Sequence, residues 1–140
     1  PSGSPWQAFN PVQTAISMGA NFVARAFAGE QDQLADLLGQ ALRHPGFALI
    51  DICQPCPSFN DVNTFQWFKE HTYTPEDHDP DDRDAAMAIS EDVEDEIALG
   101  LLYRNNRPAF EENFPWLEDG PLFEQPVDSD TLETIMQSYV

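Results

Sequence analysis

Residues 21–52, NFVARAFAGEQDQLADLLGQALRHPGFALIDI, decide the fold of this chain. The stretch begins and ends with apolar runs of strand length, at 21–27 and 47–52. Between them, leucine and alanine recur at helical spacing from 31 to 42, which predicts a helix with one apolar face. Gly29 and the pair Pro45-Gly46 supply the turns. The sequence therefore predicts a strand–helix–strand unit with short loops, the arrangement that joins two parallel strands.

The second of these strands implies more sheet than the unit itself contains. It is apolar at most positions, which is typical of a parallel strand covered on both faces. Two strands cannot bury two faces by themselves, and residues 53–140 offer few further candidates, the clearest at 98–103. We therefore expect an α/β fold in which this stretch is the edge or the C-terminal part of a larger sheet.

Helices are also predicted on both sides of the unit. Asn10 is a good N-cap, Pro11 suits a first helical position and Gly19 is typical of a helix end, so residues 11–18 are predicted to be helical. Further helices are expected at 61–71, 81–89 and 130–138, and four prolines in 104–127 indicate an extended arm. The aromatic residues of the 61–71 helix are expected to pack onto the core.

The charge of the chain is extreme and uneven. Its 140 residues carry 25 Asp/Glu and 6 Lys/Arg, a net charge of −19, of which residues 1–74 hold −3 and residues 75–140 hold −16. The scarcity of Lys and Arg argues against binding to nucleic acid or an anionic membrane, because such cations bind phosphate. A solvated surface is the simplest explanation of the acidic half. A high-salt host and an electrostatic contact with a basic partner subunit are the alternatives.

Neither a membrane protein nor a secreted one is indicated. No run approaches the roughly 20 apolar residues that a membrane helix needs, and no charged segment precedes an apolar one as in a signal peptide. Two cysteines do not make a disulfide framework, so a reducing, cytoplasmic location is expected. The chain begins with Pro1 rather than methionine, and we expect a processed product or part of a longer polypeptide.

Both cysteines lie directly after the second strand, as Cys53-Gln54-Pro55-Cys56. Open α/β sheets bind ligands at the carboxyl ends of their strands, so a metal site, a redox pair and a coincidence must each be weighed. A redox dithiol is disfavoured because Pro57 follows at once, whereas such motifs place the second cysteine in a helical turn. A complete zinc site is disfavoured because it needs about four ligands, and the histidines show no paired spacing. The other candidate ligands are His44, His71 and His78. Cys53 by itself fits the last apolar position of the strand.

Two acidic features are weighed in the same way. Asp51 stands within the apolar strand, and we expect backbone amides at the strand end to satisfy its carboxylate. A second feature is His78, whose acidic neighbours could hold a divalent cation with it; they are Asp77, Asp79, Asp81 and Asp82. Their spacing matches no EF-hand loop, so a solvated helix start is favoured. No catalytic residue is assigned, because no triad, phosphate loop or paired catalytic carboxylate is convincing.

Motifs from both halves of the chain, taken together and in order, resemble one enzyme family. In the first half they are Phe22-Val23-Ala24-Arg25, His44 to Asp51, Pro55 to Asn60, Asn63-Thr64 and Trp67-Phe68-Lys69. In the second half they are Gly100 to Arg104, Arg107-Pro108 and Glu111-Glu112. This combination is similar to the β subunit of 2-oxoacid:ferredoxin oxidoreductases, and it covers nearly the whole chain.

The resemblance implies a fold and an activity. Residues 1–74 would be the C-terminal part of a thiamine-diphosphate-binding domain with a doubly wound parallel sheet, and residues 75–140 an irregular acidic extension. The family oxidatively decarboxylates 2-oxoacids, such as pyruvate or 2-oxoglutarate, to acyl-coenzyme A. It uses thiamine diphosphate and Mg²⁺, and electrons leave through iron–sulfur clusters to ferredoxin. The implied partners are the α subunit, ferredoxin and coenzyme A.

The resemblance also separates the two cysteines. Many members carry one 4Fe–4S cluster in the β subunit, with three cysteines early in the subunit and the fourth in a Pro-Cys loop after a strand. This implies Cys56, not Cys53, as the metal ligand. The early cysteines and the Gly-Asp-Gly segment, through which Mg²⁺ holds the diphosphate, are absent from this sequence. Alone, the chain is expected to bind no cofactor and to be inactive. A non-enzymatic acidic α/β interaction module, or a CxxC thiol redox domain, is the competing interpretation.

Overall fold

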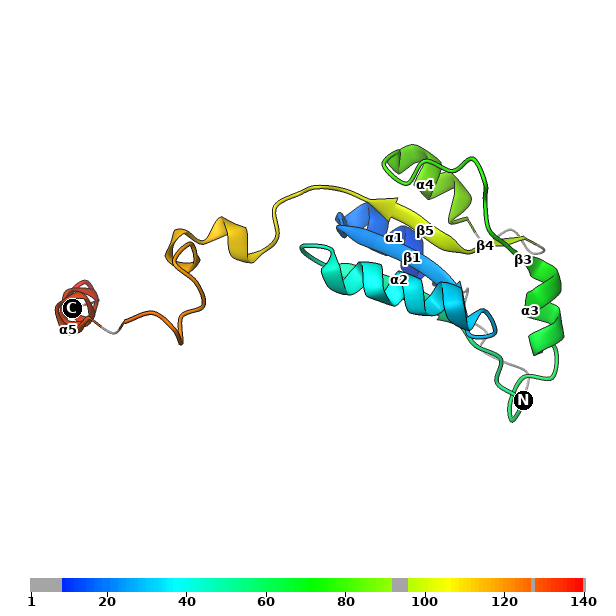
Figure 1. Ribbon diagram of the computed structural model, residues 1–140, viewed down its shortest axis with the longest axis horizontal. Coiled ribbons are helices and arrows are strands. Elements are labelled where there is room, and N and C mark those ends of the chain that lie inside the picture. Colours follow the sequence, from blue (N-terminus) through cyan, green and yellow to red (C-terminus); the bar gives the residue numbers. More distant parts are fainter. Residues whose placement is uncertain (1–8, 92–95, 127, 140) are drawn as a thin grey trace. The chain divides into compact units, whose positions relative to one another are not determined.

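The computed structural model describes residues 9–91, 96–126 and 128–139, and its centre is a three-stranded sheet with the order β2-β1-β5 (Figure 1). β1 (Phe22–Phe27) pairs in parallel with β2 (Ala48–Cys53), so that residue 22 lies opposite residue 48. α2 (Gln31–Arg43) connects the two strands. The predicted strand–helix–strand unit is therefore confirmed, and all six residues of β1 are buried.

The third strand, β5 (Gly100–Arg104), lies on the other side of β1 and runs antiparallel to it. The described sheet is therefore mixed, and the expectation of a parallel sheet was wrong for this strand. A parallel strand would need the chain to cross back to the amino end of β1 first. Instead β4 (Ile97–Ala98), which pairs with β3 (Thr72–Tyr73) near the carboxyl end of β1, leads directly into β5 (Figure 1).

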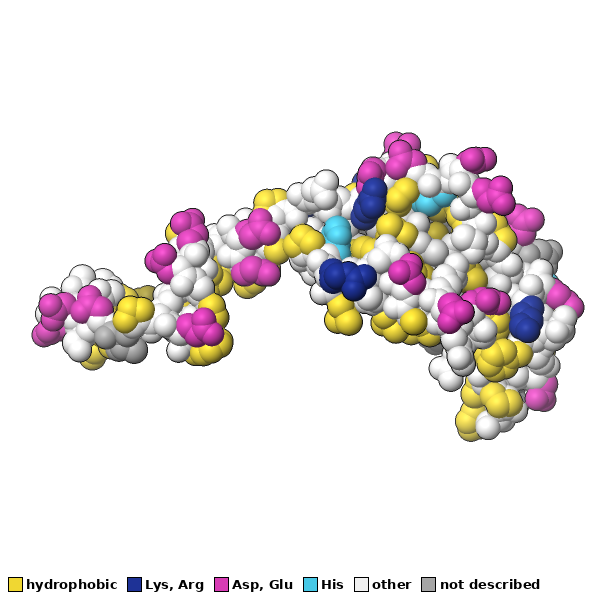
Figure 2. Space-filling model, in the orientation of Figure 1, with side chains coloured by type: hydrophobic (Ala, Val, Ile, Leu, Met, Phe, Trp, Pro, Cys, Tyr) yellow, Lys and Arg dark blue, Asp and Glu magenta, His cyan; other side chains and the backbone are white. Residues whose placement is uncertain are grey.

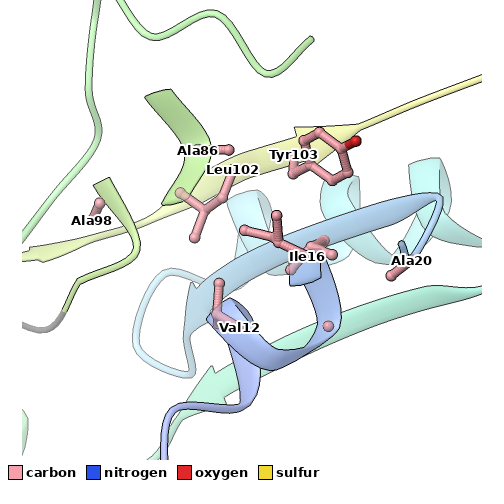
Figure 3. Packing of buried hydrophobic residues seen from close by; sticks show 9 residues of the cluster. Val12, Ile16, Ala20, Ala86, Ala98, Leu102 and Tyr103 are labelled. Carbon is pink, nitrogen blue, oxygen red and sulfur yellow. The ribbon is translucent and has the colours of Figure 1, made fainter. Parts of the chain in front are cut away.

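Helices cover both faces of this sheet. α1 (Pro11–Met18) and α4 (Arg83–Ile89) pack on one face, and α2 packs on the other. Figure 3 shows Val12 and Ile16 of α1 directed toward Leu102 of β5. The buried members of this cluster are Val12, Ala15, Ile16, Ala20, Val23, Ala86, Ala98, Leu102 and Tyr103. No helix in the described part of the chain is long and apolar enough to cross a membrane.

The helix boundaries follow from local side-chain hydrogen bonds. The Asn10 side chain caps α1 and Gly19, at φ 84°, ends it, as predicted. α3 (Phe65–His71) begins later than predicted, because the chain first makes a turn. In that turn the Asn60 carboxamide oxygen accepts the backbone N–H groups of Val62 and Asn63, both at 3.0 Å. A short polar side chain that bonds its own backbone in this way competes with helix formation.

Contacts divide the chain into two units, residues 1–107 and 108–140. The second contains two 3-10 turns, η1 (Glu111–Asn113) and η2 (Pro115–Leu117), and a closing helix, α5 (Ser129–Gln137). The predicted closing helix is thus confirmed, and both turns fall within the segment predicted as an extended arm. Residues 75–107 belong to the first unit because β5 pairs with β1. The boundary predicted at residue 74 concerns the domains of a complete subunit and stays a prediction.

β2 forms an open edge of the sheet. Within the described residues it pairs with β1 alone, and most of its side chains are half-buried. Phe47 and Ile52, near its two ends, are 62% and 42% exposed. Beside it lies an apolar hollow of about 440 Å³, lined by Phe9, Pro11, Thr14, Ala15, Met18, Gly19, Ala20, Phe47 and Leu49. An apolar edge that is open in this way agrees with the expectation that the strand belongs to a larger sheet.

Candidate functional site

The loop that carries the cysteines leaves the sheet at the carboxyl ends of the parallel strands. Cys53 is the last residue of β2 and lies opposite Phe27, the last residue of β1. The carbonyl oxygen of Cys53 accepts the backbone N–H of Ala28 (3.0 Å), which ties the two strand ends together. The predicted place of Cys53, at the end of the strand, is confirmed, and its side chain is half-buried.

Cys56 lies on a short turn beyond the strand, with a free and exposed thiol. Its carbonyl oxygen accepts the backbone N–H groups of Phe59 (3.2 Å) and Asn60 (2.9 Å), which close the turn. Pro55 on one side is buried, and Pro57 on the other fixes one backbone dihedral angle. The backbone therefore presents the thiol at the surface on a stiff turn.

An aromatic contact anchors α3, which follows this turn, against the end of β1. Phe27 is fully buried, and its ring centroid lies 5.5 Å from that of Phe65 and 5.4 Å from that of Phe68. The predicted packing of the aromatic residues onto the core is confirmed for Phe68, which is half-buried, whereas Phe65 touches Phe27 but is 52% exposed. Trp67 instead stacks on His71 of the same helix, with centroids 4.2 Å apart. The cysteine loop is therefore fixed at both ends: β2 holds its start, and the contact of α3 with Phe27 of β1 holds its end.

An ion pair lies within the sheet, two residues before Cys53. Asp51 accepts a hydrogen bond from the Arg25 guanidinium, with Oδ2 and Nε 2.9 Å apart. The expectation that backbone amides satisfy this carboxylate was wrong, because the parallel register places Arg25 of β1 directly opposite. The sequence contained a signal for this pairing. Arg25 and Asp51 are each the fourth residue of their strand, so they lie opposite each other when the two parallel strands pair from their first residues.

The acidic segment around His78 is a structural helix start. His78 Nε2 donates to the carbonyl oxygen of Leu102 (2.6 Å), because a carbonyl can only accept. Asp81 binds Arg104, with Nε and Oδ1 2.7 Å apart, and this hydrogen bond lowers the pKa of Asp81. Asp82 caps α4 through the backbone N–H groups of residues 84 and 85. These contacts are those of a helix start, as expected for the segment.

The described residues do not form a complete metal site by themselves. No group of three or more His, Cys, Asp and Glu side chains among them is arranged to hold a metal ion. A metal centre that included Cys56 would therefore need ligands from outside the described residues. Iron–sulfur clusters are held by cysteine thiolates, so a single exposed thiol on a stiff turn fits one corner of a cluster.

Family comparison connects this loop and the segment after it to one group of enzymes. Residues 56–119 match the family model for the C-terminal region of the pyruvate ferredoxin oxidoreductase β chain. The match begins at Cys56 and includes α3, α4, β5 and both 3-10 turns.

Curated relatives extend the similarity toward the N-terminus. A "2-oxoacid:ferredoxin oxidoreductase subunit beta" of Sulfolobus is 39% identical over 118 residues, 75% of this chain and 39% of the relative. The subunit beta of "2-oxoacid:ferredoxin oxidoreductase 2" of Aeropyrum pernix is 37% identical over 131 residues, 84% of this chain and 42% of the relative. The chain thus spans about two fifths of the length of these relatives.

A solved structure has the same fold over nearly the whole chain. It is the 2-oxoglutarate:ferredoxin oxidoreductase from Magnetococcus marinus, solved with 2-oxoglutarate, coenzyme A and succinyl-CoA bound. The TM-score is 0.80 at 31% identity, and the alignment covers 96% of this chain and 47% of that chain. The resemblance drawn from the sequence is therefore confirmed.

Proposed function

Because this chain is related to the β subunits of 2-oxoacid:ferredoxin oxidoreductases, we propose that it forms the C-terminal part of such a subunit. The complete enzyme oxidises a 2-oxoacid, such as pyruvate or 2-oxoglutarate, to an acyl-coenzyme A with release of CO2. The two electrons removed from the substrate pass through iron–sulfur clusters to ferredoxin. The subunit works with an α subunit in the cytoplasm.

The open edge of β2 supports the proposal that a larger domain is completed from outside this chain. Parallel strands with apolar side chains normally have both faces covered, and an edge strand presents unpaired N–H and C=O groups with which a further strand can pair. β2 is paired on one edge in the described residues, and an apolar hollow of about 440 Å³ lies next to it. The missing strands of a doubly wound, thiamine-diphosphate-binding domain would cover these surfaces.

The position of Cys56 is the single observation that supports a chemical role for this chain. Its thiol is exposed on a turn closed by two backbone hydrogen bonds, at the carboxyl ends of the parallel strands. We assign it as one ligand of a 4Fe–4S cluster, with the other thiolates supplied from outside the described residues. A bound cluster would supply one-electron transfer. Cys56 would hold one iron, and its turn would keep the sulfur in place.

Two cysteine variants of the complete β subunit test this assignment. Purified without oxygen, Cys56→Ser is expected to lose most of its cluster iron and its visible absorbance, because serine replaces a thiolate ligand. Cys53→Ser is the matched control, and it is expected to keep both, since Cys53 ends a strand and is half-buried. Loss of the cluster in Cys53→Ser with retention in Cys56→Ser would overturn the assignment.

A titration tests whether this chain lacks the rest of the cofactor site. The isolated 140-residue chain is expected to show no binding heat with thiamine diphosphate and Mg²⁺, because its sequence has no Gly-Asp-Gly segment. The complete β subunit with its α subunit is the positive control. Micromolar binding by the isolated chain would contradict the proposed division of the site.

A further inference from the structure

The turn that bears Cys56 packs little against the rest of the described chain. Among residues 54–62, Pro55 alone is buried. Figure 2 shows hydrophobic side chains at the surface of this part of the molecule, at the lower right, and the exposed ones near the turn are Phe59, Val62 and Phe65. Because packing within this chain contributes little here, hydrogen bonds between neighbouring residues set the path of the backbone through the turn.

Asn60 is the centre of these hydrogen bonds. Its backbone N–H donates to the carbonyl oxygen of Cys56 (2.9 Å). Its side-chain oxygen, Oδ1, accepts the backbone N–H groups of Val62 and Asn63, both at 3.0 Å, and its Nδ2 donates to Oδ1 of Asn63 (2.9 Å). Only the oxygen of a carboxamide can accept, so these bonds fix the orientation of the amide. All of them lie within residues 56–63, and none involves the C-terminal unit or another chain.

The same side chain connects the turn to α3. The two backbone N–H groups that it accepts lie directly before Thr64, the N-cap of α3. The carbonyl oxygen of Val62 accepts the backbone N–H of Thr64 (3.0 Å), and the Thr64 hydroxyl oxygen accepts the backbone N–H of Trp67 (3.2 Å). Asn60 therefore links the backbone of Cys56 to a helix that packs on the end of β1.

We propose that Asn60 is a positioning residue for the Cys56 thiolate, because its side chain fixes the backbone to which the sulfur is attached. This inference rests on the proposed function, which assigns Cys56 as a ligand of a 4Fe–4S cluster. Without the Asn60 acceptor the turn samples more conformations, and ordering it again when the thiolate binds iron costs conformational entropy. Replacing a residue that orients a metal ligand typically lowers metal affinity by about 10- to 100-fold.

The first measurement is the rate at which the complete β subunit, in complex with its α subunit and without oxygen, releases iron to a ferrous chelator. Asn60→Ala removes the acceptor of two backbone N–H groups, and we expect iron release at least about tenfold faster than in the wild type. Asn60→Asp is the conservative variant. Asn and Asp accept backbone N–H groups alike in such turns, so its rate is expected to stay within about threefold of the wild type.

Asp82→Ala is the matched control. It removes an acceptor of two backbone N–H groups (2.9 and 3.1 Å) at the start of α4, outside the cysteine loop. We expect it to lower the urea midpoint of unfolding about as much as Asn60→Ala does. Its iron release is expected to stay within about twofold of the wild type, because its hydrogen bonds share no partner with those of Asn60.

The second measurement tests the hydrogen bonds without a cluster. After iron has been removed, hydrogen exchange at the backbone N–H groups of Val62 and Asn63 is expected to be about fivefold faster in Asn60→Ala, the effect of one hydrogen bond. Asp82→Ala should leave this exchange unchanged. The result depends on the turn alone and is obtained whether or not Cys56 binds iron.

Fast iron release in Asn60→Ala that Asn60→Asp restores would support the positioning role. Equal rates in Asn60→Ala and Asp82→Ala, or unchanged exchange at Val62 and Asn63, would overturn it. A rate in Asn60→Asp as high as that in Asn60→Ala would also overturn it. In each of these cases a cluster that is present in the wild type and lost in Cys56→Ser leaves the proposed function intact, whereas a wild-type complex without a cluster would overturn both proposals.

Discussion

Arg25 and Asp51 face each other across the parallel strands β1 and β2, with Nε and Oδ2 2.9 Å apart. The Arg25 side chain is 2% exposed, whereas that of Asp51 is 29% exposed at the open edge. Removal of one partner from a buried ion pair is strongly destabilising, because the other charge is left without compensation. This pair therefore joins the central strand to the edge strand that carries the cysteine loop.

Removal of the carboxylate is expected to destabilise the fold. Asp51→Asn takes the negative charge from beside a buried guanidinium, and we expect the free energy of unfolding to fall by about 3 kcal/mol. Urea unfolding followed by tryptophan fluorescence measures the change. Asp81→Asn is the control, because its exposed pair with Arg104 is screened by solvent and its loss is expected to be much smaller. Equal losses in the two variants would contradict the importance of the buried pair.

The pair of Asp81 and Arg104 is expected to stabilise the protein in a pH-dependent way. The hydrogen bond from Arg104 lowers the pKa of Asp81 in the folded protein below its ordinary value of 3.8. The unfolded chain therefore takes up the proton first, so this contribution is present above pH 3.8 and is lost as the pH falls through the lowered pKa. The difference in urea midpoint between the wild type and Asp81→Asn should be constant near neutral pH and shrink in acid. A difference that grows toward low pH would show the opposite linkage.

Two glycines are expected to respond in opposite directions to alanine. Gly46 has φ 95°, and a Cβ there would lie 2.5 Å from the side chain of the buried Asn21, so Gly46→Ala should cost about 2 kcal/mol. Gly39 lies inside α2, where a Cβ would meet the flexible end of Arg43 at 3.2 Å. Gly39→Ala is therefore expected to be neutral or to stabilise by up to about 1 kcal/mol. Thermal unfolding distinguishes the two, and stabilisation by Gly46→Ala would contradict the described turn.

Phe27 is expected to hold both the core and the cysteine loop. Phe27→Ala removes a fully buried ring from its contacts with Phe65 and Phe68 and should cost about 3 to 5 kcal/mol. Hydrogen exchange of residues 56–71 should accelerate because α3 loses its anchor. Phe59→Ala is the control, since this ring is 84% exposed and its loss should change stability little. Unchanged exchange in Phe27→Ala would show that α3 is anchored elsewhere.

Local patterns predicted the elements because their causes lie within a few residues. The cap at Asn10, the αL residue Gly19 and the leucine repeat of α2 each act over one or two helical turns. The late start of α3 shows the limit of such patterns. The sequence around Asn60 is compatible with a helix or with a turn. The turn forms because the Asn60 side chain accepts two backbone N–H groups that follow it.

The candidate site was predicted in part. The sequence placed Cys53 at a strand end, as the structure shows, and the resemblance selected Cys56. The partner of Asp51 was missed, because it lies 26 residues away and is reached only through the register of the two strands. The role of Cys56 as a cluster ligand stays a prediction.

The sequence by itself determined the helices, the parallel strand pair and the family, because caps, hydrophobic periodicity and motifs depend on residues that are close together in the sequence. The tertiary structure alone decided two further features: the antiparallel course of β5 and the ion pair of Arg25 with Asp51. Strand direction and register depend on the path of the chain between distant segments, which short-range propensities do not encode.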